Sequence, residues 1–188
     1  MSFLLSITIK FKGEIRLNIR EAKVEDAEGI ARVHVDCWRT TYKNIIPRTY
    51  LDSLSYAQRT EVWKKNITNA SNYVFVAENS KGEIVGFADG GKRETNTHED
   101  TGDLTSIYIF DQWQGKGIGK GLMKQLFLQF KKLGYKTIFV EVLEDNKSRF
   151  FYESMGANLF KSQKMNIGGK ELNLLVYQWN SLNSILTN

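Results

Sequence analysis

The hydrophobic positions of the chain follow two periods, which predict an alternation of strands and helices. Alternating or continuous runs rich in β-branched and aromatic residues are typical of strands, and they occur at 14–20, 73–78, 84–89, 103–110, 136–143, 158–166 and 171–179. Apolar residues recur at helical spacing over 24–40, 55–66, 118–133 and 146–155. The predicted element order is β-α-α-β-β-β-α-β-α-β-β.

This order predicts one domain of mixed α/β (α+β) class over residues 15–180. The strands at 103–110 and 136–143 flank a helix and should lie parallel, because crossover connections join parallel strands. The other connections favour hairpins, so we expect a mostly antiparallel central sheet of about seven strands with helices on both faces. Residues 1–14 form either an extra edge strand or an extension, and residues 181–188 a flexible tail.

Composition narrows the setting in which this domain works. The chain has 188 residues and a net charge of +5, and its 26 Lys and Arg are interleaved with acids, which argues against a nucleic-acid partner. Its one cysteine, Cys37, cannot form an intramolecular disulfide, and no export signal is evident, so we expect a cytoplasmic protein. No apolar run approaches the ~20 residues that span a bilayer, so no membrane partner is expected.

A glycine-rich turn joins the strand at 103–110 to the helix at 118–133. Glycine stands at alternate positions between Gln114 and Gly121. The first N–H groups of a helix lack partners and carry partial positive charge, and glycine lets an anion approach them. The order of strand, turn and helix therefore predicts a phosphate cradle. The spacing fits neither the dinucleotide fingerprint nor the nucleotide-triphosphate loop, and the alternative is a turn that only connects two elements.

Two blocks of sequence carry a family resemblance. The first is residues 104–121, with the pattern Gln114-x-x-Gly117-x-Gly119, and the second is residues 146–156, Asn-Lys-Ser-Arg-Phe-Phe-Tyr-Glu-Ser-Met-Gly. In this order and spacing they resemble the GNAT superfamily of acyl-CoA-dependent N-acetyltransferases. The resemblance implies the fold of that family and the transfer of an acetyl group from acetyl-CoA to a primary amine, by direct attack in a ternary complex.

The resemblance also implies where acetyl-CoA binds. In the family, the strand before the turn pairs through its backbone with the pantetheine arm, the turn cradles the pyrophosphate, and an asparagine of the second block holds the pantetheine. The matching residues here are Ile107, Tyr108 and Ile109 for the strand, Gln114, Gly115, Lys116, Gly117, Ile118, Gly119 and Lys120 for the turn, and Asn146 for the asparagine.

Transfer to an amine requires an acid and a base. Family members often use a tyrosine at the position of Tyr152 to protonate the leaving thiolate, whose intrinsic pKa is about 8.5; the alternative for Tyr152 is a packed aromatic residue. An alkylamine is protonated at pH 7 and must lose a proton before it attacks. Asp103 is the first candidate base, with Glu141 as an alternative and His34 as a distant third, although the family often works through water. The backbone N–H of Ile109 is expected to polarise the thioester carbonyl.

The acceptor side is less determined by the sequence. Trp38 and Tyr42 are candidate substrate-binding residues, because residues 38–51 are similar to the acceptor-side region of many small bacterial family members. His34 is a third candidate, because it sits within an apolar stripe of its helix and could line a cleft. Aromatic packing is the alternative for all three. Asp89 belongs to a set of acids that could attract a cationic amine, although a solvated loop is the simpler interpretation. The acceptor stays open among a small amine, an amino acid, an antibiotic and a protein N-terminus.

Other functions are weighed against this one. A non-catalytic acyl-CoA-binding sensor or regulatory domain is the alternative to the enzyme. No metal is expected, because His98 lies among acids without a second histidine at ligand spacing. Homodimers are common in the family, so a second copy of the chain is compatible with the sequence as a partner.

Overall fold

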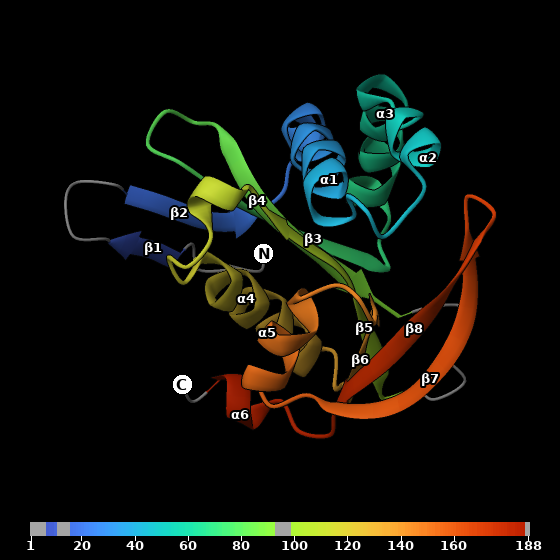
Figure 1. Cartoon of the computed structure of the whole chain (residues 1–188). Helices are drawn as coiled ribbons and strands as arrows, with labels where there is room; N and C mark the ends of the chain where they lie inside the picture. Colours follow the sequence, from blue (N-terminus) through green and yellow to red (C-terminus); the bar gives the residue numbers. More distant parts are fainter. Residues whose placement is uncertain (1–6, 11–15, 93–98, 187–188) are drawn as a thin grey trace.

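The computed structural model describes residues 7–10, 16–92 and 99–186, and eight strands in this part of the chain form one sheet. Their order along the sheet is β1-β2-β3-β4-β5-β6-β8-β7 (Figure 1). Neighbouring strands pair antiparallel except for β5 and β6, which are parallel. The mixed, mostly antiparallel sheet predicted from the sequence is confirmed. The strands are β1 (Ile7–Lys10), β2 (Arg16–Glu21), β3 (Asn72–Glu78), β4 (Ile84–Gly91), β5 (Thr101–Ile109), β6 (Thr137–Leu143), β7 (Asn158–Ile167) and β8 (Lys170–Trp179).

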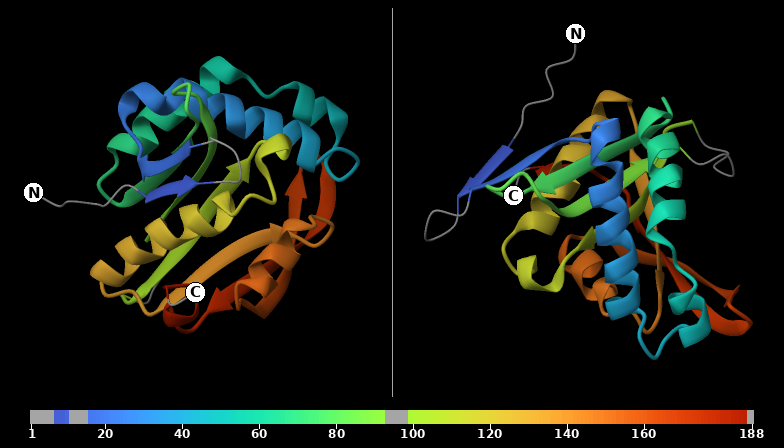
Figure 2. Two further views of the ribbon diagram at one scale, coloured as in Figure 1. Left: turned by 90° about the vertical axis from the view of Figure 1, so that its left-hand side faces the viewer. Right: turned by 90° about the horizontal axis from the view of Figure 1, so that it is seen from above.

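Helices cover both faces of this sheet (Figure 1, Figure 2). On one face α1 (Ala27–Thr41) and α3 (Tyr56–Thr68) lie side by side, and the short α2 (Arg48–Asp52) connects them. On the other face lie α4 (Ile118–Lys132) and α5 (Ser148–Ser154). The predicted helices are therefore present on the two faces, whereas α2 was not predicted, because five residues give too little apolar periodicity to recognise.

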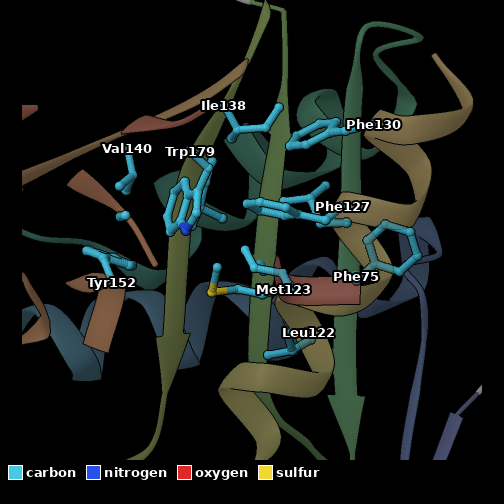
Figure 3. Packing of buried hydrophobic residues seen from close by; sticks show 14 of the residues in the cluster. Phe75, Leu122, Met123, Phe127, Phe130, Ile138, Val140, Tyr152 and Trp179 are labelled. Atoms are coloured by element: carbon cyan, nitrogen blue, oxygen red, sulfur yellow. The ribbon is translucent and has the colours of Figure 1, made fainter. Parts of the chain in front are cut away.

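The largest hydrophobic cluster fills the space between α4 and the sheet (Figure 3). Leu122, Met123, Phe127 and Phe130 are fully buried on one side of α4, and Trp179 of β8 meets Phe127 edge-on, with ring centroids 5.2 Å apart. Burying such a side chain contributes about 1.5–3 kcal/mol. This packing holds α4 against the sheet and so fixes the position of its first turn.

Both ends of the described chain are attached to the fold. Residues 7–10 form the edge strand β1, which pairs antiparallel with β2; the rest of the predicted N-terminal extension, residues 1–6 and 11–14, lies outside the described residues. The flexible tail predicted for residues 181–188 is wrong for its described part. Leu182 and Ile185 are buried in the main cluster, and α6 (Asn183–Leu186) follows β8. Two apolar residues three positions apart give this short helix one apolar side.

The sheet splits between its two parallel strands. Pairing of β5 with β6 ends at Leu104 and Val140, although β5 continues to Ile109 and β6 to Leu143. At the same point the register between β4 and β5 shifts by one residue. Asp89 pairs with Ser106, whereas the next residue, Gly90, pairs with Leu104. Thr105 is thus an extra residue of the kind that bends a strand. Beyond it no strand of the described residues pairs with this edge of β5, and a short 3-10 helix (Asp111–Trp113) leads from β5 to the glycine-rich turn.

Candidate active site

The glycine-rich turn ends in a left-handed residue that starts α4. Gly115 has φ +70° and Gly117, the cap of the helix, has φ +74°. This backbone conformation favours glycine. The first bond within the helix runs from the N–H of Gly121 to the carbonyl of Gly117 at 3.0 Å, so the amides between them have no partner in the helix. The predicted anion-binding arrangement of strand, turn and helix start is therefore present.

A groove of about 470 Å³ adjoins this turn. Ile107 and Ile109 of β5 form one wall, and Phe151 and Tyr152 of α5 the other. The two walls approach closely at Gly119, where an added Cβ would lie 3.2 Å from Cζ of Phe151. Both blocks of the sequence pattern thus line one groove. Its complete lining is Ile107, Ile109, Trp113, Gln114, Gly115, Gly117, Ile118, Gly119, Lys120, Lys147, Ser148, Phe151 and Tyr152.

Lysine side chains place positive charge along the groove. Lys120 lines it, and Lys147 at the start of α5 adds a second cation that the sequence analysis did not include. Lys116 does not line the groove; its Nζ lies 4.7 Å from the centre of the Trp113 ring. Gln114 closes the turn, because its Nε2 donates to the carbonyl of Ile109 at 3.0 Å. A phosphate-bearing ligand fits this set of amides, glycines and lysines.

Tyr152 is a buried residue that lines the groove. Its side chain is 6% exposed, and its ring meets Trp179 edge-on with centroids 6.1 Å apart. Burial raises the pKa of its hydroxyl, and the nearby Tyr42 adds to that shift. The phenol is therefore protonated at neutral pH and can donate a proton or a hydrogen bond. The side chain is both packed and groove-lining, so the two interpretations from sequence are compatible.

Three polar side chains connect the groove with the α1 side of the sheet. The hydroxyls of Tyr42 and Tyr108 lie 3.4 Å apart, and Nδ2 of Asn146 donates to the Tyr42 hydroxyl at 3.3 Å. Oδ1 of Asn146 accepts from the N–H of Ser148 at 2.9 Å. Asn146 is buried and does not appear among the groove-lining residues. The Tyr108 side chain, for which only a backbone role was predicted, thus belongs to the opposite face.

An aromatic cluster on α1 surrounds the predicted acceptor residues. The ring of His34 stacks on Trp38 with centroids 5.8 Å apart, and lies 5.3 Å from the ring of Tyr108. Its Nδ1 accepts from Nε1 of Trp63 at 3.3 Å. Burial lowers the pKa of His34 to about 3, and the charge of Arg59 acts in the same direction. His34, Trp38 and Tyr42 therefore gather at one place, where an imidazole with so low a pKa is too weak a base to be a good candidate.

The candidate bases lie in the strands. Asp103 is 5% exposed in β5, opposite Phe139 of β6, and Glu141 follows two residues further along β6, on the same face as Phe139. Both therefore lie on the face turned away from α4. Asp103 and Glu141 remain predictions as bases.

Asp89 carries a buried carboxyl group. The predicted solvated loop is wrong for this residue, since Asp89 is 3% exposed in β4 and accepts a hydrogen bond from Oγ of Ser106. Burial raises its pKa to about 6, and the hydrogen bonds from Ser106 and Asn72 limit that shift. The sequence contained an indication of this burial, because Asp89 ends an otherwise apolar strand.

Cys37 is a core residue. It is buried in α1, and burial raises the pKa of its thiol to about 12, while the backbone N–H of Ile109 acts in the opposite direction. A thiol of this kind is protonated at neutral pH and is not a nucleophile. In the part of the chain that the structure describes, no group of three metal-ligating side chains is found. No helix among the described residues is long and apolar enough to cross a membrane.

The chain is similar to known proteins in sequence and in fold. The model of the acetyltransferase (GNAT) family matches residues 31–157. An N-acetyltransferase of Bacillus subtilis (strain 168), YuaI, is 35% identical over 171 residues, which are 91% of this chain and 97% of that protein. The chain therefore belongs to the GNAT family of acetyltransferases.

Two further relatives carry named acceptors. The [ribosomal protein bS18]-alanine N-acetyltransferase of Haemophilus influenzae is 40% identical over 76 residues, 40% of this chain and 49% of that protein. The spermine/spermidine N(1)-acetyltransferase of Bacillus subtilis is 28% identical over 131 residues, 64% of this chain and 85% of that protein. Alanine termini and polyamines are different acceptors, so family membership alone does not select one.

Solved structures share the fold. An N-acetyltransferase from Staphylococcus aureus Mu50 superimposes with a TM-score of 0.72 at 22% identity, covering 88% of this chain and 98% of that one. The PaiA N-acetyltransferase from Thermoplasma acidophilum, in complex with coenzyme A, gives a TM-score of 0.67 at 20% identity, over 87% and 99% of the two chains. The fold expected from the resemblance is confirmed.

Proposed function

We propose that this protein transfers an acetyl group from acetyl-CoA to a primary amine by direct attack in a ternary complex. The observation that carries the proposal is the single groove that joins the amides at the start of α4 to the buried hydroxyl-bearing Tyr152. One end of this groove suits a pyrophosphate and the other suits a leaving thiolate. A phosphate site without an acid at its far end would suit a binding protein equally well.

The position of each residue suggests which part of acetyl-CoA it would bind. The amides of Ile118, Gly119 and Lys120 would bind the pyrophosphate, and the free edge of β5 at Ile107 and Ile109 would pair with the pantetheine arm. Asn146, which is hydrogen-bonded to Tyr42 and Ser148 and does not line the groove, would hold the pantetheine, as the family pattern implies. These roles follow from the family pattern and from the groove-lining positions.

Tyr152 would act as the general acid. Attack of the amine on the thioester forms a C–N bond and breaks the C–S bond, so the sulfur leaves with the electron pair and needs a proton. A phenol whose pKa is raised by burial carries that proton at neutral pH. The amine must lose its own proton, and Asp103 or Glu141, directly or through water, would accept it.

The test compares the wild type with Tyr152→Phe in a thiol-release assay with acetyl-CoA and a panel of amines. We expect turnover to fall at least tenfold, which corresponds to about 1.4 kcal/mol of transition-state stabilisation, while calorimetry shows unchanged acetyl-CoA affinity. Tyr135→Phe is the matched control, because Tyr135 packs on Phe130 and lies outside the groove lining.

Each other outcome has a distinct meaning. Full activity in Tyr152→Phe would exclude Tyr152 as the acid. Tight acetyl-CoA binding without turnover of any amine would favour the acyl-CoA sensor. Absence of acetyl-CoA binding would refute the phosphate cradle and with it the proposal.

The partners follow from the same proposal. The acceptor would be a small-molecule or peptide amine, which the two relatives with named acceptors support. A cytoplasmic location and a homodimer stay predictions from the sequence.

A further inference from the structure

Two lysine side chains line the groove from opposite walls. The walls approach closely where Gly119 of α4 meets Phe151 of α5, since an added Cβ on Gly119 would lie 3.2 Å from Cζ of Phe151. Lys120 directly follows Gly119, and Lys147, the cap residue of α5, precedes Phe151 by four residues. Residues four apart on a helix lie on the same side, and the backbone of Lys147 is helical, with φ −60° and ψ −16°. Both lysines therefore belong to the same stretch of the groove.

Neither lysine has an anionic partner in the part of the chain that the structure describes. No ion pair there involves Lys120 or Lys147, and the groove lining contains no Asp or Glu. Lys116, by contrast, lies over the Trp113 ring and does not line the groove. Like charges placed along one groove repel each other, so this arrangement becomes favourable when an anion binds between them.

Acetyl-CoA has one charged group that the proposed function does not yet place. The amides at the start of α4 would bind the pyrophosphate, whereas the pantetheine arm and the thioester are uncharged. The remaining anion is the phosphate on the 3′ carbon of the ribose, and a phosphate monoester carries about 1.5–2 negative charges at pH 7. The cations that remain in the groove lining are Lys120 and Lys147. Charge complementarity therefore pairs the 3′-phosphate with these two lysines.

We propose that Lys120 and Lys147 bind the 3′-phosphate of CoA, one from each wall of the groove, and so select a donor that carries this phosphate. An acyl group carried on 4′-phosphopantetheine alone would lack both contacts. Both lysines are exposed, so each contact is modest in strength and is weakened by salt. This inference rests on the proposed binding of acetyl-CoA in the groove and adds a specificity for the donor.

The test compares two ligands that differ by one phosphate. CoA and 3′-dephospho-CoA share the pyrophosphate, the adenosine and the pantetheine arm, so the ratio of their dissociation constants reports the 3′-phosphate alone. By calorimetry at low salt, we expect the wild type to bind CoA about fivefold more tightly than 3′-dephospho-CoA. Lys120→Met and Lys147→Met should each lower this preference to about twofold, and the double variant should abolish it. The affinity for 3′-dephospho-CoA should stay nearly constant throughout.

Lys132→Met is the matched control. It removes the same charge from the last turn of α4, about 18 Å along the helix from Lys120, where salt screens its effect on the groove. Lys132 lies outside the groove lining, so this variant should keep the wild-type preference for CoA. An equal fall of the preference in Lys132→Met would indicate a general effect of net charge and would contradict the inference.

The outcomes separate this inference from the transferase proposal. Equal wild-type affinity for CoA and 3′-dephospho-CoA would overturn the inference and leave the transferase proposal intact. An equal loss of affinity for both ligands in the lysine variants would also overturn it, because the lysines would then bind the pyrophosphate that the two ligands share. Failure to bind either ligand would refute the groove as a CoA site and both proposals with it.

Discussion

Two buried titratable side chains on the α1 side of the sheet should give stability opposite dependences on pH. Asp89 has an ordinary pKa of 3.8 that burial raises to about 6, despite bonds from Ser106 and Asn72. His34 has an ordinary pKa of 6.5 that burial lowers to about 3, with Arg59 acting in the same direction. Between pH 4 and 6 the folded protein therefore binds one proton more at Asp89 and one fewer at His34 than the unfolded chain.

The signs follow from proton linkage. The contribution of Asp89 is fully present below pH 3.8 and is lost as pH rises toward 6, whereas that of His34 is fully present above pH 6.5 and is lost as pH falls toward 3. Each changes the free energy of unfolding by up to about 1.4 kcal/mol per pH unit, and in the wild type the two offset each other. Urea unfolding of Asp89→Asn should show stability rising with pH between 4 and 6, and His34→Gln should show it falling. If the free energy of unfolding changed with pH in both variants as it does in the wild type, the pKa shifts assigned to Asp89 and His34 would be wrong.

Individual residues show which parts of the site could be predicted from the sequence and which could not. Tyr152 and the glycines of the turn were found because they belong to local patterns, and they line one groove in the structure. Asp89 was missed because its burial depends on Ser106, seventeen positions away. The hydrogen bond from Trp63 to Nδ1 of His34 was missed for the same reason, because the two residues are 29 positions apart.

At the scale of elements, the start and the end of α4 offer a controlled comparison. Gly117 before its first turn has φ +74°, and Gly134 after its last turn has φ +81°; an added Cβ would meet nothing within 4 Å at either place. Alanine at each should therefore lower the free energy of unfolding by about 1–2 kcal/mol, from backbone strain alone.

Only one of these variants should affect ligand binding. Gly117→Ala places a methyl group in the groove and changes the direction of the amides that follow, so its acetyl-CoA dissociation constant should rise at least fivefold by calorimetry. Gly134→Ala should leave that constant unchanged. Equal dissociation constants in two variants of equal stability would show that the turn does not bind the phosphates.

The pairing of two strands can be easier to predict from the sequence than the point where they separate. The parallel pairing of β5 and β6 was predictable, because a strand–helix–strand crossover allows little else. The point where these strands separate, after Leu104 and Val140, was not predictable, because it results from the extra residue opposite Asp89 and Gly90 in β4. The groove therefore depends on the register between neighbouring strands, which the sequence of one strand alone does not determine.

At the scale of the whole molecule, the acceptor side is closed by segments from opposite ends of the chain. The segment between α1 and α2 packs against the β7–β8 hairpin in a cluster that includes Tyr42, Leu51, Leu172 and Leu174. Nζ of Lys170 donates to the carbonyl of Ile45 at 2.8 Å. Tyr42 and Trp38, which belong to this cluster, are thus packed against the hairpin.

The hairpin turn allows this contact to be tested. Gly168 and Gly169 both have positive φ, +59° and +83°, but an added Cβ would lie 3.1 Å from Cβ of Tyr50 at Gly168 and would meet nothing at Gly169. Alanine costs similar backbone strain at both positions, so any difference reports the contact with Tyr50. Gly168→Ala should raise the KM for the amine acceptor at least threefold over Gly169→Ala, with equal acetyl-CoA affinity, because the displaced segment carries Tyr42. Equal KM values would mean that the hairpin supports the fold without shaping the acceptor side, and selectivity would then depend on α1 alone.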